Sequence, residues 1–249
     1  MKKYLVIGNP IDHSLSPKLH NYWIKKNKID AIYEKKLLIE SDLEKIISKL
    51  KLGEIDGINV TLPFKNSIIP YIDELSIEAK KTQSVNTIYC KNNKTIGHNT
   101  DIAGFELGLR HFKYNVLEKK VLILGAGGVV PSIIFALKKM GASHIVLSNR
   151  TKSKAENIKK IFPEIGIIDW GKTGEFHMII NATSIGLKSD DEIKINHNDF
   201  GKNKFFYDVI YNPKHTNFLK KAKKEGNQIE NGKMMFIYQA HQAFTIWHK

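Results

Sequence analysis

The chain has 249 residues, of which 42% are hydrophobic and 26% are charged, with a formal net charge of +14 and a pI near 9.6. This composition is typical of a globular protein, and the length suits one large domain or two small ones. The single cysteine excludes an intrachain disulfide framework or a thiolate metal cluster.

The positive charge is dispersed along the chain. Lysines run from Lys2 to Lys249 without a long block of like charge, which favours anionic small molecules over nucleic acid as partners. No apolar run is long enough to cross a membrane, and the run before Gly8 is too short for the core of a signal peptide. We therefore expect a cytoplasmic protein with no nucleic-acid or membrane partner.

The first hundred residues alternate apolar runs with amphipathic segments, which predicts an α/β layer structure. Ser16 is expected to cap a helix that starts at Pro17 and turns Leu19, Tyr22 and Trp23 toward the core. We expect strands over residues 4–7, 31–39, 57–62, 84–89 and from 95 to 97, and further helices from 41, over 66–71, over 76–82 and from 101.

The stretch 57–65 is the first candidate site. It alternates apolar residues, the last of them Leu62, with small hydrogen-bonding ones, and we expect the apolar side chains in the core. Pro63 cannot extend a central ladder and suits the first position of a helix, so Lys65 is expected in that helix's first turn. A cation there opposes the helix dipole and marks a candidate site residue; the alternative is an ordinary surface lysine.

The pattern changes from residue 119 onward. A buried strand over 121–124 meets Gly125-Ala126-Gly127-Gly128 and a helix over 131–140, which is the strand–glycine turn–helix order of dinucleotide-binding proteins. Val130 stands at the usual third glycine. We expect further strands at 145–147, 166–168, 176–180, 205–210 and near 229, and helices over 153–162, 216–225 and 233–247.

The loop after the second strand of this unit bears on the choice of cofactor. NAD-binding units place an acid about 20 residues after the glycines, where it binds the ribose 2′-hydroxyl, yet no Asp or Glu lies between Gly125 and Ala155. Asn149-Arg150-Thr151 stands there instead, followed by Lys152 and Lys154. Because an arginine suits a 2′-phosphate, NADP(H) is favoured over NAD; the alternative is a basic loop in a basic protein.

A series of short motifs appears in one order along the chain. They are Gly8-Asn9-Pro10, Ser14-x-Ser16-Pro17, Asn59-Val60-Thr61-x-Pro63-x-Lys65, Val85-Asn86-Thr87, Asn99-Thr100-Asp101-x-x-Gly104, Gly125-Ala126-Gly127-Gly128, Asn149-Arg150-Thr151, Asn181-Ala182-Thr183-Ser184, Tyr211-Asn212-Pro213 and Gln239. In this order and spacing the chain resembles the shikimate dehydrogenase family, which includes the shikimate/quinate dehydrogenases, over essentially its whole length.

The resemblance implies an α/β fold of two lobes. One is a mostly parallel substrate-binding and catalytic lobe over residues 1–103, completed by the final helix 233–249. The other is a Rossmann-type, doubly wound NADP-binding lobe over 104–232. Met234 departs from the family, which usually has a glycine at that point before the last helix.

The resemblance also implies an activity and residue roles. The family members are NADP-dependent oxidoreductases that act on a CH–OH group and reduce 3-dehydroshikimate, reversibly, in chorismate and aromatic amino-acid biosynthesis. Lys65 and Asp101 would be the catalytic pair, and no metal is implied. The substrate ligands would be Ser14, Ser16, Asn59, Thr61, Asn86, Asp101, Tyr211 and Gln239. The NADP(H) ligands would be Gly125, Ala126, Gly127, Gly128, Val129, Asn149, Arg150, Thr151, Lys154, Thr183, Val209 and Gly232.

Two alternatives stay open at this point. One is a quinate/shikimate dehydrogenase of broader specificity, and the other is a nucleotide-binding regulator that lacks activity. The sequence fits a monomer or a homodimer. An opposite charge beside Lys65 favours its ammonium form, whereas burial favours the neutral amine, so the resting protonation state is also open.

Overall fold

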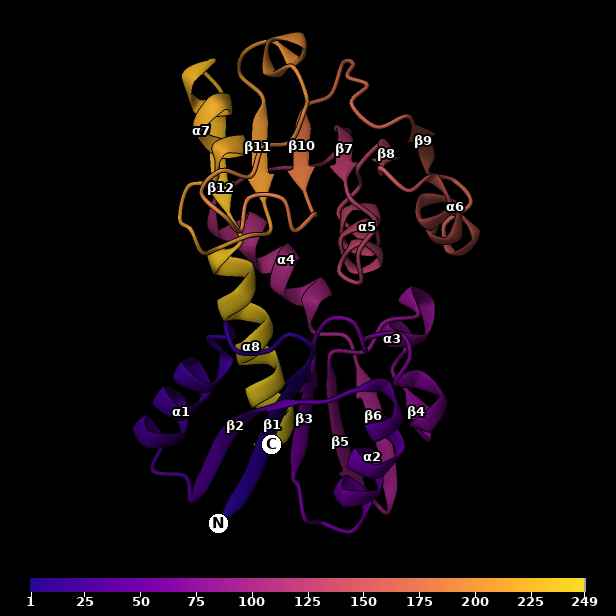
Figure 1. Cartoon of the computed structure of the whole chain (residues 1–249), viewed down its shortest axis with the longest axis vertical. Coiled ribbons are helices and arrows are strands. Elements are labelled where there is room, and N and C mark those ends of the chain that lie inside the picture. Colours follow the sequence, from indigo (N-terminus) through magenta and orange to yellow (C-terminus); the bar gives the residue numbers. More distant parts are fainter. Residues whose placement is uncertain (249) are drawn as a thin grey trace. The chain divides into compact units, whose positions relative to one another are not determined.

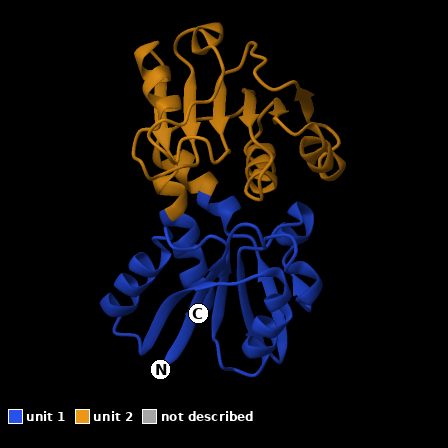
Figure 2. Cartoon of the chain, viewed as in Figure 1, with its two compact units in different colours: residues 1–104, 237–249 blue, residues 105–236 orange. Residues whose placement is uncertain are grey.

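The computed structural model describes residues 1–248 and divides into two compact units (Figure 2). Unit 1 comprises residues 1–104 and 237–249, and unit 2 comprises residues 105–236. The helices α4 (Asp101–His111) and α8 (Lys233–Trp247) each contribute residues to both units. The sequence placed the corresponding lobe boundaries at 103 and 232.

Unit 1 is built on a six-stranded mixed sheet of order β2-β1-β3-β5-β6-β4 (Figure 1). β1 runs parallel to β2 and β3, whereas β5 is antiparallel to β3 and β6. The strands are β1 (Lys2–Gly8), β2 (Ala31–Leu37), β3 (Gly57–Val60), β4 (Glu74–Leu75), β5 (Thr87–Lys91) and β6 (Lys94–His98). The helices are α1 (Ser16–Lys26), α2 (Leu43–Lys51) and α3 (Ile77–Thr82), with short 3₁₀ turns at Glu40–Asp42 and Ile69–Tyr71.

The two faces of this sheet carry separate cores because successive side chains of a strand point to opposite faces. Leu5 and Ile7 of β1 join Ile58 and Val60 of β3 in a cluster with the apolar stripe of α2. The opposite face packs against α1 and α8 (Figure 1). Its buried residues are Tyr4, Val6, Ile11, Ile24, Tyr33, Ala243 and Trp247.

The helix α1 turns a different set of side chains inward than the sequence suggested. Tyr22 is 59% exposed, and the buried residues are His20 and Ile24. The expected inward position of Tyr22 is therefore wrong. His20 takes the buried place instead, with its ring stacked 4.2 Å from the ring of Tyr33.

Unit 2 holds a six-stranded, all-parallel sheet of order β12-β11-β10-β7-β8-β9. Counted from β7, this is the order 3-2-1-4-5-6 read from its other edge, which is the dinucleotide-binding order. The strands are β7 (Lys120–Leu124), β8 (His144–Ser148), β9 (Gly166–Ile168), β10 (Met178–Asn181), β11 (Phe205–Asp208) and β12 (Gln228–Asn231). Its other helices are α5 (Val130–Lys139), α6 (Lys152–Ile161) and α7 (Asn217–Lys224), with a 3₁₀ turn at His197–Phe200.

The central strands β7 and β10 of unit 2 are apolar runs because both faces of the sheet are covered there. Every residue of β10 and β11 is buried, and α7 packs Phe218, Leu219 and Ala222 into the cluster on one face. Among residues 1–248, no helix combines the length and apolar character needed to cross a membrane. The predicted α/β fold with a Rossmann-type half is confirmed.

Candidate active site

The turn after β3 presents Lys65. The strand ends at Val60, and a cis Leu62–Pro63 bond then redirects the chain. No helix starts at Pro63, so the expected helix there is wrong, and the helical residues between 66 and 71 are limited to the 3₁₀ turn Ile69–Tyr71. Leu62 is 54% exposed instead of buried, because the ladder has already ended. The dipole argument for Lys65 therefore does not apply.

Backbone contacts fix Lys65 instead. Its carbonyl oxygen accepts from the Val85 N–H at 2.8 Å, and the neighbouring Asn66 side chain donates to the Gln83 carbonyl at 3.0 Å. The ammonium Nζ lies 2.6 Å from Asp101 Oδ2, with the two side chains only 11% and 7% exposed. Two opposite charges this close and this well covered from water attract far more strongly than a surface pair.

Asp101 is the first residue of α4, where a carboxylate lies at the positive end of the helix dipole. Its backbone N–H donates to Asn99 Oδ1 at 3.1 Å. Its side chain spans two partners, because Oδ2 faces Lys65 and Oδ1 accepts from Asn86 Nδ2 at 3.0 Å. Residues from the turn after β3, from the segment before β5 and from the start of α4 thus hold the carboxylate in one orientation.

Asn86 is the centre of the network. Its Nδ2 lies 2.9 Å from Thr100 Oγ1 and 3.4 Å from Gln239 Oε1, in addition to Asp101. Its Oδ1 accepts from the Thr100 N–H at 2.8 Å and from the Thr87 hydroxyl at 3.1 Å. Gln239 comes from α8, so the last helix of the chain joins the same cluster within unit 1.

Asn59 is buried on the sheet face that packs against α1 and α8, the face opposite to Ile58 and Val60. Its Nδ2 donates to the Asn86 carbonyl and to Thr87 Oγ1, both at 3.0 Å. Its Oδ1 accepts from the Tyr33 hydroxyl at 2.7 Å. Both amide hydrogens are thus committed to the protein, and one lone pair of Oδ1 is left for a ligand.

The two serines lie at the start of α1. Ser16 is the first residue of the helix, and its side chain does not cap it; the expected cap is wrong. The Ser14 hydroxyl oxygen accepts from the Ser16 N–H at 3.3 Å, which leaves the hydroxyl hydrogen of Ser14 to donate. Burial raises the pKa of Tyr33 well above its usual value, and the Ser16 side chain offsets part of that rise. Thr61 is partly exposed beyond the end of β3.

Unit 2 forms its candidate cofactor site between β7 and β10, where the strand order reverses. Gly125 follows β7 with φ +112°, and a Cβ there would lie 2.7 Å from the Ala182 carbonyl oxygen. The turn thus passes close to the segment after β10, which requires glycine. No side chain caps the N-terminus of α5 after Gly127, Gly128 and Val129, a geometry that suits a phosphate group.

The basic loop lies at the end of β8. Asn149 Nδ2 donates to the Thr151 carbonyl at 2.7 Å, and α6 begins at Lys152. Arg150 and Lys154 are exposed. An anionic group at this loop therefore meets both exposed cations and a helix N-terminus.

The last residues of β10 and β11 are hydrogen-bonded to each other. Asn181 Oδ1 accepts from the Thr183 N–H and hydroxyl at 3.0 and 2.7 Å, and its Nδ2 donates to Asp208 Oδ1 at 3.0 Å. Asp208 also accepts from the Thr216 hydroxyl and the Ile210 N–H. Burial raises the pKa of Asp208 to about 6, and these donors oppose that rise.

Gly232, just before α8, lies against the backbone of Val209 in unit 2. A Cβ on Gly232 would lie only 2.1 Å from the Val209 carbonyl oxygen, so the two backbones touch and only glycine fits. Tyr211 stacks on Phe236 with 4.6 Å between ring centroids. The expected cofactor residues Val209 and Gly232 therefore lie together, and Met234 does not prevent that approach.

Several network members were not expected as site residues from the sequence. Thr87, Asn99 and Thr100 fall inside motifs that were noted, so the motif residues themselves were the available signal. Tyr33 gave no signal, because an isolated tyrosine in a strand is normally core, and only its tertiary contacts identify it. Asp208 ends a strand, where polar residues line a cofactor crevice, but the sequence did not show its burial or its partner Asn181.

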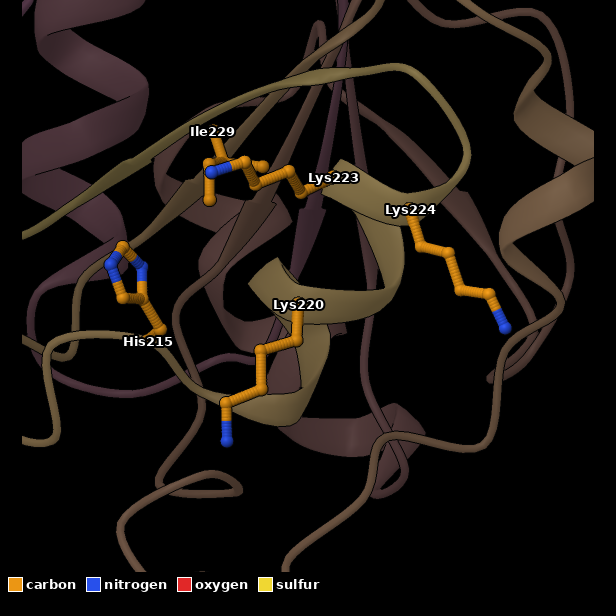
Figure 3. A pocket seen from close by; sticks show the side chains of 5 residues that line it. All are labelled: His215, Lys220, Lys223, Lys224 and Ile229. Atoms are coloured by element: carbon orange, nitrogen blue, oxygen red, sulfur yellow. The ribbon is translucent and has the colours of Figure 1, made fainter.

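A separate cavity of about 400 Å³ lies on unit 2 and is lined by His215, Lys220, Lys223, Lys224 and Ile229. Figure 3 shows that the lysine amines point in different directions. Binding sites need convergent polar groups, so this cavity carries none of the chemistry described above. No group of three or more His, Cys, Asp or Glu side chains among residues 1–248 is arranged to hold a metal ion.

Comparison with known proteins gives a consistent result. Residues 6–88 match the family model for the shikimate dehydrogenase substrate binding domain, and residues 106–185 match that for shikimate / quinate 5-dehydrogenase. The shikimate dehydrogenase (NADP(+)) of Pelagibacter ubique is 64% identical over 248 residues, covering 100% of this chain and 94% of the relative.

Solved structures agree with these matches. The shikimate dehydrogenase of Aquifex aeolicus superposes with a TM-score of 0.92 at 38% identity, over 99% of this chain and 92% of its own. That of Thermus thermophilus, in complex with NADP(H) and shikimate, gives 0.91 at 29% identity, over 99% and 93% of the two chains. With the fold, the polar cluster and these matches together, the chain belongs to the shikimate dehydrogenase family.

Proposed function

We propose that the protein catalyses the reversible, NADPH-dependent reduction of 3-dehydroshikimate to shikimate, the reaction of chorismate and aromatic amino-acid biosynthesis. The observation that carries the proposal is the covered ion pair between Lys65 Nζ and Asp101 Oδ2 at 2.6 Å, set inside a cluster of oriented amides. The 64% identity to a shikimate dehydrogenase (NADP(+)) supports the substrate and cofactor.

NADPH supplies the hydride when it is bound. The protein's part is to place a proton where the ketone oxygen gains negative charge. Lys65 as ammonium donates to that oxygen, and Asp101 holds Lys65 in place and shares the proton. General acid catalysis of this kind contributes about 10²–10⁴-fold to the rate.

The substrate ligands divide by hydrogen-bonding character. Ser14 and Ser16 offer hydroxyl hydrogens and would hold the substrate carboxylate. Asn59 Oδ1 and Asp101 offer lone pairs, so they would accept from ring hydroxyls. Asn86, Thr61 and Gln239 would bind ring hydroxyls as well. Tyr211 of unit 2 would lie beside the substrate. Residues 1–103 with the final helix thus act as the substrate lobe, and 104–232 as the NADP lobe.

The cofactor ligands are part of the same proposal. The turn Gly125–Val129 at the uncapped N-terminus of α5 would hold the pyrophosphate. Asn149, Arg150, Thr151 and Lys154 would bind the adenosine 2′-phosphate. Thr183, Val209 and Gly232 would line the nicotinamide. The proposal includes a cytoplasmic location and a monomer or homodimer without nucleic-acid partners.

The test measures reduced nicotinamide by absorbance, with shikimate against quinate and NADP against NAD. We expect efficient turnover only with shikimate and NADP. Robust NAD-linked quinate oxidation would instead identify a quinate/shikimate dehydrogenase of broader specificity. A protein that binds NADP but turns over neither substrate would be the regulator.

The catalytic assignment has a matched control. Lys65→Ala should lower turnover by about 10²–10⁴-fold with little change in NADP affinity. Lys94 forms an ion pair of the same 2.6 Å length with Glu74, but on the surface, with the side chains 61% and 50% exposed. Lys94→Ala should keep normal turnover. Near-normal turnover of Lys65→Ala would refute the role of Lys65.

A further inference from the structure

Tyr33 is a fully covered polar side chain beside the candidate substrate ligands. It lies on β2, is 1% exposed, and reaches past β1 to donate to Asn59 Oδ1 on β3 at 2.7 Å. The hydroxyl of Tyr33 therefore contacts a residue that is assigned to a ring hydroxyl of the substrate.

The donor direction of this hydrogen bond is fixed by the other partners of Asn59. Because Asn59 Nδ2 donates to the Asn86 carbonyl and to Thr87 Oγ1, its Oδ1 faces Tyr33 and the phenol is the donor. Burial raises the pKa of Tyr33 well above its usual value, and the group thus remains a neutral donor near neutral pH.

The backbone and the ring of Tyr33 are also held in place. Asn21 of α1 donates to the Tyr33 carbonyl at 2.8 Å and accepts from its N–H at 2.9 Å. The ring stacks on His20 at 4.2 Å with 6° between the planes, and the Trp247 ring lies 6.1 Å away. A phenylalanine would fill this space without the cost of burying a hydroxyl, so the hydroxyl needs a role beyond packing.

We propose that Tyr33 is a positioning residue for substrate binding. Its hydroxyl occupies one lone pair of Asn59 Oδ1 and so directs the other lone pair toward a ring hydroxyl of the substrate. Tyr33 acts on the substrate through Asn59. This role rests on the proposed function, which assigns Asn59 as a substrate ligand.

The test is the Tyr33→Phe variant beside the Tyr4→Phe variant. Tyr4 is the cross-strand partner of Tyr33 on β1, is 1% exposed, and packs in the same cluster, so it is a matched control. We expect Tyr33→Phe to raise the KM for shikimate about tenfold, the effect of one lost hydrogen bond, with the KM for NADP unchanged. Tyr4→Phe should change neither.

A double-mutant cycle separates positioning from packing. Asn59→Ala and Tyr33→Phe should be non-additive in the KM for shikimate, because Tyr33 acts on the substrate only through Asn59. A purely structural role predicts additive effects, or equal changes in both KM values. Either result, or a Tyr33→Phe KM equal to that of Tyr4→Phe, overturns the proposal.

Two further measurements complete the test. If the wild-type enzyme does not oxidise shikimate with NADP, the proposed function is refuted, and not only the positioning role of Tyr33. If Tyr33→Phe fails to fold, wild-type protein labelled with ¹³C at the tyrosine phenol carbon is titrated with shikimate. The Tyr33 signal must then shift more than the Tyr4 signal, and an unmoved Tyr33 signal rejects the role.

Discussion

Asp208 is a buried acid whose replacement should reveal its contribution to stability. Burial raises its pKa from 3.8 to about 6, although Thr216, Ile210 and Asn181 all donate to it. Because the folded chain binds this proton more tightly than the unfolded chain, the stabilisation is complete below about pH 4. It is lost as the pH rises through about 6.

The size of the effect follows from the shift. About two pH units correspond to about 3 kcal/mol of folding free energy. Asp208→Asn is expected to keep all three contacts. The new amide oxygen accepts from Asn181 and Ile210, and the new amide nitrogen donates to Thr216 Oγ1. The variant should therefore lack the loss between pH 4 and 6 and should be up to about 3 kcal/mol more stable at pH 7.

The assay is urea unfolding from pH 4 to 8, with hydrogen exchange of β10 and β11 as the readout local to unit 2. Asp191→Asn is the matched control in the same unit. Asp191 accepts from the Gly186 and Lys188 N–H groups, which lower its pKa, so its removal should destabilise the protein at neutral pH. A difference between Asp208→Asn and wild type that does not vary with pH would refute the reasoning.

Three further predictions concern the cofactor turn, the buried histidine and the basic loop. Gly125→Ala should lower the free energy of unfolding by about 1–3 kcal/mol, because its new Cβ would lie 2.7 Å from the Ala182 carbonyl oxygen in a residue with positive φ. In Gly127→Ala the new Cβ would lie 3.8 Å from the same carbonyl oxygen, so this control variant should fold normally. Thermal unfolding of both variants checks the prediction. His20 has its pKa lowered to about 3 by burial, so folding loses up to about 5 kcal/mol as the pH falls from 6.5 to 3; His20→Phe should shift acid unfolding to lower pH, and an unchanged midpoint in near-UV circular dichroism would contradict this. Arg150→Ala should weaken NADP binding by about tenfold or more and leave NAD binding unchanged, and equal losses for both cofactors would argue against a 2′-phosphate contact.

Elements with a strong apolar pattern could be predicted from the sequence. The parallel strands β7, β8, β10 and β11 are apolar runs bounded by glycine or polar residues, and their predicted positions overlap the observed ones. The strands β5 and β6 overlap the predicted strands at 84–89 and 95–97, and Asn92 and Asn93 between them have the positive φ that a two-residue hairpin turn requires. Local pattern suffices in these cases because burial on both faces, or a two-residue turn, leaves few alternatives.

The ends of elements could not be predicted in the same way. Pro63 is compatible with a helix start or with a cis turn, and the sequence does not distinguish the two. Ser16 is compatible with a helix N-cap, yet its own backbone N–H donates to the Ser14 hydroxyl oxygen. In α1, His20 is buried and Tyr22 is exposed, and the buried His20 ring stacks on Tyr33 of another element. A local pattern does not contain that contact.

The polar cluster of unit 1 sorts donors from acceptors before any substrate is bound. The amide hydrogens of Asn59 are used within the protein, so this residue presents oxygen toward a ligand, whereas both the amide hydrogens and the carbonyl oxygen of Asn86 have protein partners. Lys65, by contrast, carries hydrogens only. A ring acid needs acceptors at its hydroxyls and donors at its carboxylate and ketone, and a misplaced hydroxyl would leave a buried donor or acceptor unpaired. Because Tyr33, Thr87 and Thr100 fix these directions, selectivity for the substrate depends on residues that need not contact it.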